Sequence, residues 1–267
     1  MNNVIMNAPV FLLLFIRCFT MLLTLPLFSM RAVSRLAKVA LAGYMAFFLL
    51  GTVDFSSYNQ FIREDGIFSL NYLFIAIGEG LIGVIIGFYI TIIFSAFSSA
   101  GQFMAFQMGF SAASTYDSLS QVENPLMGQF FNFIAMLIFM QSQWFQRLFL
   151  GGLGSSVKNL NTISLILNRE DFVQFLLRGL TKLFSDALII SLPIMGTLLL
   201  ISICTGLLSK AAPQMNLLSE GFPIMILVSF LLIFILIPVM SDFFIRSFEN
   251  GFFNLDNLFN LNPGGAK

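Results

Sequence analysis

Three charged side chains, Arg17, Glu79 and Asp186, fall inside strongly apolar stretches of this sequence. A charge at the centre of a bilayer costs several kcal/mol, so each of them should face protein or water. Together they could form an ion-coupled site, and an ion-coupled secondary transporter that uses Glu79, Asp186 and Arg17 is one possible function. Such a transporter usually has two related halves, and the chain shows no convincing internal repeat. A hydrogen-bonded carboxyl at a helix interface is the favoured interpretation of both acids.

The residue types that most catalytic sites need are not found in a usable arrangement. The absence of histidine from the sequence excludes Ser-His-Asp catalysis and zinc motifs of the HExxH type. The glycine-rich residues 151–156 lack the GK[ST] of a phosphate-binding loop. Tyr116-Asp117 matches one half of an intramembrane aspartyl protease motif, but no GxGD supplies the second carboxylate. We therefore expect no enzymatic activity, no cofactor and no metal.

The composition indicates an integral membrane protein. Of the 267 residues 58% are apolar and 10% are charged, whereas soluble domains have roughly 45–50% apolar and about 25% charged residues. Thirteen Lys and Arg balance 13 Asp and Glu, so no net field attracts nucleic acid. Cys18 and Cys204 both lie in apolar runs, which makes a disulfide framework improbable.

Six apolar blocks predict the helices that must position these residues, and most blocks reach the roughly 20 residues of a spanning helix. The third block would be about 42 Å long at ~1.5 Å per residue, so it must tilt, bend or protrude. Pro193 and Pro238 predict kinks in the last two blocks. We expect an all-α, multi-pass membrane protein built from kinked helical hairpins. The blocks are residues 8–28, 36–53, 70–97, 125–140, 180–208 and 222–240, the last with a Phe-rich tail to 253.

Small residues recur every fourth position along the third block. In a helix they would leave a nearly bare stripe where another backbone can approach closely. Generic helix packing explains such a pattern equally well, because GxxxG is frequent in membrane helices. The length of the ladder predicts a tight helix–helix interface. Its members are Gly83, Gly87, Thr91, Ser95 and Ser99, with Glu79 one step before them.

Two connections between blocks have unusual compositions. No Lys or Arg occurs between residues 100 and 128, and residues 101–118 mix Met and Phe with Gly, Ala and Ser. Such a segment suits a pliable apolar plug or, equally, a re-entrant segment without a gating role.

The short link after the fifth block carries Pro213, Gln214 and Asn216 and predicts the tip of an antiparallel hairpin. Its amides could bond freed backbone groups or line a wet passage, but a simple helix-capping turn is favoured.

Several motifs occur together in an order and spacing that resemble the FliR/SctT family of type III export-gate subunits. The resemblance extends over about residues 11–239. Its N-terminal part rests on Arg17, PLF at 26–28 and RLAK at 35–38. Its stronger central and C-terminal parts rest on EGLIG at 79–83, GF at 87–88, AGQ at 100–102, QMGFS at 107–111, GLL at 206–208, APQMN at 212–216 and GFP at 221–223.

The resemblance implies a non-enzymatic subunit of a closed, helical protein-export channel in the bacterial inner membrane, within the flagellar basal body. Its partners would be FliP-like and FliQ-like subunits, FlhB-like and FlhA-like export components, membrane lipid and unfolded proteins in transit. Residues 1–267 would form one integral membrane domain. Within it, residues 1–178 would be similar to FliP, and residues 179–250 to the helical hairpin of FliQ.

The resemblance also implies a plug near residues 107–119. Among the residues of this segment and the helix before it, we expect five large side chains to close the channel and Gly109 to supply flexibility. Glu79, Gly83, Gly87 and Ser95 are expected to pack helices together. The five expected closure residues are Met104, Phe106, Met108, Phe110 and Tyr116.

Overall fold

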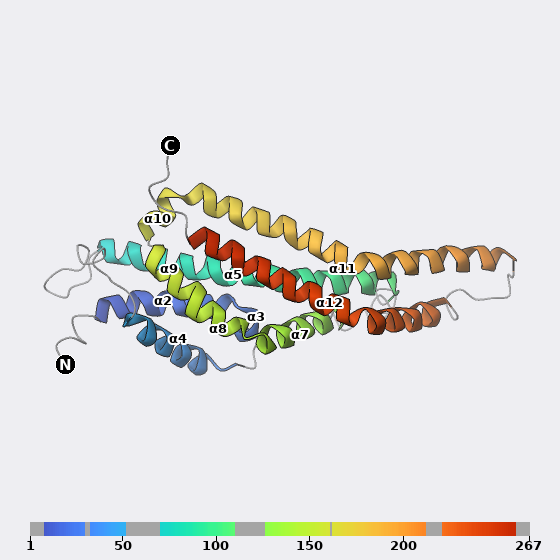
Figure 1. Ribbon diagram of the computed structural model, residues 1–267, viewed down its shortest axis with the longest axis horizontal. Helices are drawn as coiled ribbons and strands as arrows, with labels where there is room; N and C mark the ends of the chain where they lie inside the picture. Colours follow the sequence, from blue (N-terminus) through green and yellow to red (C-terminus); the bar gives the residue numbers. More distant parts are fainter. Residues whose placement is uncertain are drawn as a thin grey trace, which may run out of the picture. The chain divides into compact units, whose positions relative to one another are not determined.

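The computed structural model describes residues 8–29, 33–51, 70–109, 126–160, 162–211 and 221–259, and all regular secondary structure in them is helical (Figure 1). The prediction of an all-α, multi-pass membrane fold is confirmed. The elements are α2 (Ala8–Thr24), α3 (Pro26–Ser29), α4 (Arg35–Leu50), α5 (Leu70–Gln107), α7 (Leu126–Gln141), α8 (Trp144–Arg147), the π-helix η2 (Leu148–Leu153), α9 (Gly154–Asn159), α10 (Thr162–Leu167), α11 (Arg169–Ala211) and α12 (Phe222–Phe259).

Each of the six predicted blocks contains a helix, but the helices differ in length from the blocks. In the described residues three helices are long and apolar enough to cross a membrane: α5, α11 and α12. The helices α2, α4 and α7 have only 17, 16 and 16 residues. The first, second and fourth blocks therefore form helices that are shorter than the roughly 20 residues of a spanning helix. In the first block the helix is interrupted at Leu25, and the short helix α3 begins at Pro26.

Two boundaries extend beyond the prediction. Helix α5 continues past residue 97 to Gln107, so residues 101–107 are helix and not the start of a connection. The small residues there are compatible with helix because Gly101 lies against the backbone of α7 at Met127. The Phe-rich tail of the sixth block is helical to Phe259, and its phenylalanines supply buried core side chains. Helices α11 and α12 continue through Pro193 and Pro238, whose kinks stay predictions.

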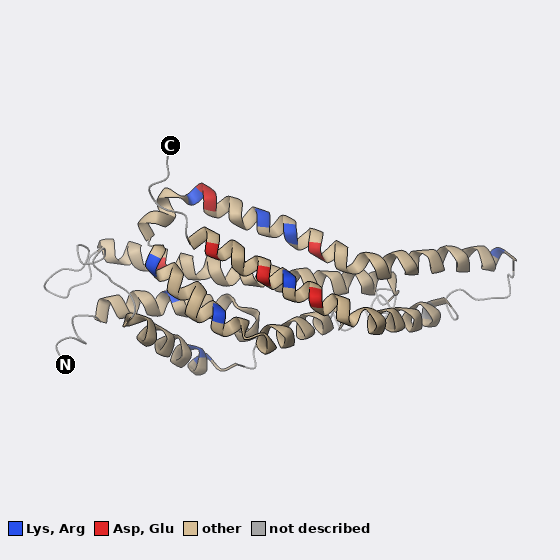
Figure 2. Cartoon of the chain, in the orientation of Figure 1, with Lys and Arg blue, Asp and Glu red and all other residues tan. Residues whose placement is uncertain are grey.

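The chain divides into two compact units. The first contains residues 1–92, 142–179 and 249–267, and the second contains residues 93–141 and 180–248. Charged residues are sparse on most of the helices, and α7 has none (Figure 2). The assignment of residues 1–178 and 179–250 to FliP-like and FliQ-like parts is a separate question and stays a prediction.

The first unit places α2 and α4 side by side (Figure 1). The core here includes Cys18, Met21 and Leu22 of α2, each fully buried. Elsewhere in this unit the rings of Trp144 and Phe252 stack with their centroids 4.9 Å apart. Such aromatic pairs contribute about 0.5–1.5 kcal/mol beyond the burial of their area.

The second unit has an aromatic core. Phe94 and Phe97 of α5 contact rings of α7 and α12, and the closest centroids, those of Phe97 and Phe244, are 4.0 Å apart. Phe139 and Phe248 lie 5.3 Å apart in a T-shaped arrangement. These side chains are almost fully buried, so they fix how α5, α7 and α12 pack within this unit.

Candidate functional site

A buried ion pair joins α2 to α5 in the first unit. The Nε of Arg17 donates a hydrogen bond to Oε2 of Glu79 at 2.6 Å. The two residues are only 1% and 2% exposed. The other guanidinium nitrogens of Arg17 donate to Oγ of Ser156 at 3.2 Å and to the carbonyl of Leu160 at 2.9 Å. The hydroxyl of Thr162 lies 3.3 Å from Oε1 of Glu79.

These five residues, the Arg17–Glu79 cluster, bring three parts of the chain to one point. Helix α2 supplies the guanidinium, α5 the carboxylate, and the α9–α10 region the hydroxyls and the carbonyl. Removing two charges from water is costly, and the ion pair offsets that cost only when further hydrogen bonds satisfy both groups. This arrangement supplies such bonds on each side. Its geometry suits fastening helices together, because the carboxylate has bound partners and almost no exposure to water.

The predicted small-residue ladder lies against the backbone of α2 in its N-terminal part. A Cβ atom built on Gly83 would collide with the carbonyl oxygen of Arg17 and with Oγ1 of Thr20. A Cβ on Gly87 would lie 2.6 Å from the carbonyl oxygen of Met21. Only glycine permits this approach, so these two positions set the separation of the helices.

The next residue of the ladder, Thr91, contacts α2 through a hydrogen bond. Thr91 donates from Oγ1 to the carbonyl of Thr24 in α2 at 2.7 Å. Ser95 is half-buried and belongs to the second unit, so its predicted packing role stays a prediction.

Helices α5 and α7 meet through reciprocal glycines in the second unit. A Cβ on Gly101 would lie 2.5 Å from the carbonyl oxygen of Met127. A Cβ on Gly128 would lie 2.9 Å from the carbonyl oxygen of Ser98 and 3.1 Å from its Oγ. The backbones therefore touch at both positions. Gly128 was not singled out from the sequence, since a lone glycine at the start of an apolar helix carries no spacing signal.

The predicted closure residues differ in their surroundings. Met104 and Met108, one turn apart on α5 and just beyond it, are fully buried, whereas Phe106 between them is 70% exposed. Gly109 follows the helix with a φ of 85°, a left-handed conformation that glycine adopts at helix C-termini. Phe110 and Tyr116 lie outside the described residues, as do the predicted hairpin-tip residues Pro213, Gln214 and Asn216.

Asp186 has a partner of its own in the second unit. Ser247 of α12 donates from Oγ to Oδ2 of Asp186 at 2.9 Å, and both side chains are buried. Lys182 lies one turn earlier on α11. The three charges considered for an ion-coupled site thus have separate roles in the structure: Arg17 pairs with Glu79, and Asp186 bonds Ser247.

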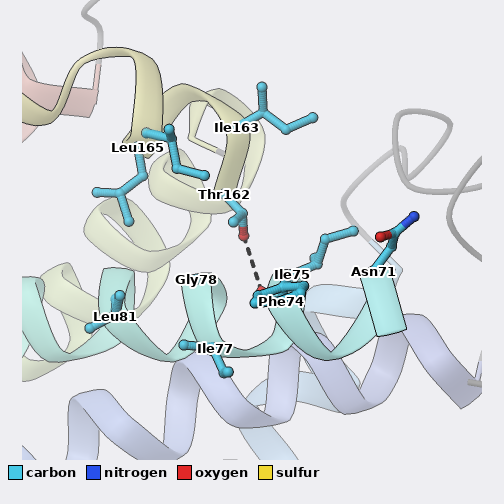
Figure 3. Close-up of a pocket in the computed structure, with 10 residues that line it drawn as sticks. Asn71, Phe74, Ile75, Ile77, Gly78, Leu81, Thr162, Ile163 and Leu165 are labelled. Atoms are coloured by element: carbon cyan, nitrogen blue, oxygen red, sulfur yellow. Dashed lines mark hydrogen bonds between the residues drawn. The ribbon is translucent and has the colours of Figure 1, made fainter. Parts of the chain in front are cut away.

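A shallow groove of about 360 Å³ lies between the start of α5 and α10 (Figure 3). Its lining is almost wholly apolar, with Phe74 and Ile77 on α5 and Ile163 on α10. Thr162 approaches α5 where Gly78 leaves space and donates to the carbonyl of Ile75 at 3.1 Å. The groove lacks the convergent polar groups that orient a small polar ligand.

The described residues contain no group of three or more His, Cys, Asp or Glu that could hold a metal ion. Sequence reasoning missed Ser156, Leu160 and Thr162, since hydroxyls and a carbonyl in a short amphipathic region have no distinguishing pattern. A signal for the ion pair did exist. Arg17 and Glu79 are oppositely charged residues within the first and third apolar blocks, and each needs a counter-charge there.

Apolar helices that are joined by a buried ion pair, and whose glycines admit neighbouring backbones, define a multi-pass helical membrane protein. The sequence matches the family of bacterial export proteins, family 1, over residues 8–251. The chain belongs to this family, which confirms the resemblance inferred from the motifs.

Its relatives are bacterial. The chain is 31% identical over 242 residues to the flagellar biosynthetic protein FliR of Bacillus subtilis, covering 90% of each chain. It is 34% identical over 173 residues to FliR of Borreliella burgdorferi, covering 64% of each. It is also 29% identical over 166 residues to the surface presentation of antigens protein SpaR of Shigella sonnei, covering 61% of this chain and 62% of the relative.

Proposed function

We propose that the chain is an export-gate subunit of a flagellar type III secretion apparatus and that it forms the protein-conducting channel with FliP-like and FliQ-like subunits. The observation that carries this proposal is the family match over residues 8–251, with near full-length similarity to a protein named FliR. The chain then resides in the bacterial inner membrane at the flagellar basal body. FlhB-like and FlhA-like components are its further partners, and it passes unfolded proteins without enzymatic activity.

Helix α4 supports a role within an assembly. Its Leu36, Tyr44 and Phe47 are 79%, 66% and 70% exposed. Large exposed apolar and aromatic side chains are typical of surfaces that other subunits cover. In the proposed gate this face of α4 contacts a neighbouring subunit.

The end of α5 supports a role in closing the channel. Met104 and Met108 anchor the end of α5 inside the second unit, and Gly109 then turns the chain out of the helix. Phe106 points away from this interior, since 70% of it is exposed. In the proposal Phe106, with Phe110 and Tyr116 of the plug near residues 107–119, fills the passage when no protein is in transit.

Purification of the tagged chain in mild detergent tests the assembly. Co-purification of FliP-like and FliQ-like subunits in excess supports the proposal, and a lone monomer that is active by itself refutes it. Closure is tested in the assembled complex by replacing Phe106 with Ser. Phe253→Ser is the matched control, because Phe253 is similarly exposed at 64% but lies near the end of α12.

Ion conductance across the membrane should rise for Phe106→Ser and stay at the wild-type level for Phe253→Ser. Equal conductance in wild type, Phe106→Ser and a variant with Met108-Gly109-Phe110 replaced by small polar residues would refute the closing role. Co-purification is measured on the same samples, so a failure of closure is distinguished from a failure of assembly.

A further inference from the structure

The first turn of α4 concentrates positive charge. Arg35 and Lys38 are the charged residues of this helix, and both lie within its first four residues (Figure 2). The first turn contains no Asp or Glu. The N-terminus of a helix carries a partial positive charge, so cations are unfavourable there and an anion nearby is favourable. This end of α4 therefore attracts negative charge.

Backbone donors add to the positive charge at this helix end. Ser34 caps the helix, because its Oγ accepts a hydrogen bond from the N–H of Ala37 at 3.2 Å. The carbonyl of Ser34 accepts from the N–H of Lys38 at 3.3 Å. The N–H groups of Arg35 and Leu36 precede the helical hydrogen-bond pattern, and no described residue accepts from them. Two N–H groups and two cationic side chains thus lie at one helix end.

Lys38 is buried without a counter-charge among the described residues. It is 9% exposed and lies one turn before Ala42, on the side of α4 that packs on α2. No acid or hydrogen-bond acceptor in the described part of the chain pairs with its ammonium, whereas the buried Arg17 pairs with Glu79. The ammonium is not one of the fully enclosed atoms without a partner in that part, so it reaches the surface. An anion from outside the chain can therefore contact this lysine while its stem stays covered.

The outer side of α4 next to this turn is apolar and aromatic. Leu36, Tyr44 and Phe47 are 79%, 66% and 70% exposed. No charge follows Lys38 in the helix, so residues 39–50 contain no ionisable side chain except the phenol of Tyr44. The surface thus joins a cationic end to an apolar side. We call it the α4 docking face, and it consists of Arg35, Leu36, Lys38, Tyr44 and Phe47.

The dimensions of the α4 docking face fit a protein better than lipid. Helix α4 has 16 residues and is about 24 Å long, shorter than the roughly 30 Å of bilayer hydrocarbon. The part without charge, residues 39–50, extends over only about 18 Å. Aromatic residues and Arg are enriched at protein–protein interfaces. A helix with an apolar side and a carboxylate near one end complements both parts of this face.

We propose that the α4 docking face binds a helix of a neighbouring subunit, and that this helix carries an Asp or Glu that pairs with Lys38. Arg35 and the N–H groups of the first turn lie beside that carboxylate and increase its attraction. The apolar side of the partner helix covers Leu36, Tyr44 and Phe47. This inference rests on the proposed function, because it requires the chain to work within an assembly. It adds the chemistry of the partner surface and names the residue that recognises it.

Charge variants of Lys38 test the pairing in the tagged, assembled complex. Lys38→Glu should lower the yield of co-purified subunits about tenfold or more, because two carboxylates would then face each other. Lys38→Met should lower the yield less, and Lys38→Arg should largely keep it, because a guanidinium also pairs with a carboxylate. Lys158→Glu is the matched control, because Lys158 is an exposed lysine of α9 in the same unit and should leave the yield unchanged.

The outcome also separates this inference from the proposed function. If the wild-type chain co-purifies with no other subunit, the proposed function fails. If the wild-type chain and Lys38→Glu co-purify with equal amounts of the other subunits, only this inference fails.

Thermal melting of the full chain, expressed without its partners, separates recognition from a structural role. No residue that the structure describes pairs with the ammonium of Lys38, so Lys38→Met should melt at or above the wild-type temperature. The complex of the same variant should nevertheless lose subunits. A lower melting temperature of the isolated Lys38→Met chain would show that Lys38 stabilises the chain itself, and it would overturn the proposal.

A photo-reactive benzoylphenylalanine in place of Leu36 identifies what covers the α4 docking face in the complex. The matched control position is Leu167 of α10, which is 70% exposed and should not capture the same peptide. An adduct at residue 36 with a helix of another subunit, within one turn of an Asp or Glu, supports the proposal. An adduct with another part of this chain, with lipid, or with a peptide that has no acid within one turn overturns it.

Discussion

Replacing Arg17 with Met should strongly destabilise the protein, and replacing Glu79 with Met in the same chain should restore most of the loss. Each single variant leaves one buried charge without its counter-charge, whereas the double variant removes both charges. Breaking a buried ion pair costs about 3–5 kcal/mol, but replacing both members with apolar residues is often neutral or stabilising. Met is suited to both sites because it is flexible and fills irregular space.

The contacts in the cluster set the remaining cost of the double variant. Ser156 keeps its hydrogen bond to the carbonyl of Leu153 at 2.9 Å, and Thr162 keeps its bond to the carbonyl of Ile75 at 3.1 Å. The carbonyl of Leu160 and Oγ of Ser156 each lose the donor that Arg17 supplied, and a buried acceptor left without a partner costs about 1–3 kcal/mol. The free energies of the two single replacements should therefore be far from additive.

The assay is the apparent melting temperature of the purified complex for wild type, both single variants and the double variant. At roughly 2–4 °C per kcal/mol, each single variant should melt on the order of 10 °C below wild type, and the double variant should recover at least half of that. Arg178→Met is the control, because Arg178 is exposed and should shift stability by less than about 0.5 kcal/mol. Additive losses in the double variant would refute the reasoning.

The same variants separate the two function classes raised by the sequence. A fastening role predicts that the stable double variant still exports protein, since no charge is needed once the helices are held. An ion-coupled transporter predicts a stable but inactive double variant, because its coupling carboxylate is gone. A folded double variant without export would therefore contradict the structural role assigned to the Arg17–Glu79 cluster.

Three further predictions concern glycines. Gly83→Val should reduce the amount of assembled complex, because its side chain would collide with α2, while Gly43→Ala, with nothing within 4 Å, should leave it unchanged; equal yields would refute the tight contact. Gly109→Ala should lower the free energy of unfolding by about 1–2 kcal/mol because φ at this residue is 85°, and Gly109→Asn should lower it less. A thermal melting series in which the Asn variant is the less stable of the two would contradict this conformation. In a Cys204→Ser background, the double variant Ser98→Cys with Gly128→Cys should form a disulfide on mild oxidation, since a Cβ on Gly128 lies 3.1 Å from Oγ of Ser98. The disulfide is detected as a shift in gel mobility that a reductant reverses. If no such shift occurs, α5 and α7 lie further apart than the structure shows.

The sequence predicted the existence of the main helices better than their ends. Apolar blocks locate helices because the backbone must satisfy its own hydrogen bonds in lipid. They do not locate helix ends. A glycine such as Gly101, or a Phe-rich tail, is compatible with helix and with loop until another helix packs against it. The short helices α8, α9 and α10 and the π-helix η2 fall in a weakly amphipathic, glycine-containing region, where local pattern has little information.

The candidate site was only partly predictable for a related reason. Spacing along one helix indicated that Gly83 and Gly87 would admit another backbone, but it gave no sign that α2 would be that neighbour. Burial of Arg17 and Glu79 followed from their apolar surroundings. Their pairing depends on contacts across 62 residues, which no local pattern specifies.

The sequence separations within the Arg17–Glu79 cluster have a consequence during biosynthesis. Arg17 is made 62 residues before Glu79 and 143 residues before Leu160. At about 5–20 residues per second, the guanidinium waits roughly 3–12 s for its counter-charge and about 7–29 s for its last acceptor. Throughout that interval a lone α2 would carry an uncompensated charge, which hydrocarbon disfavours. We therefore expect α2 to reach its final position together with α5, after the ribosome has delivered at least 79 residues.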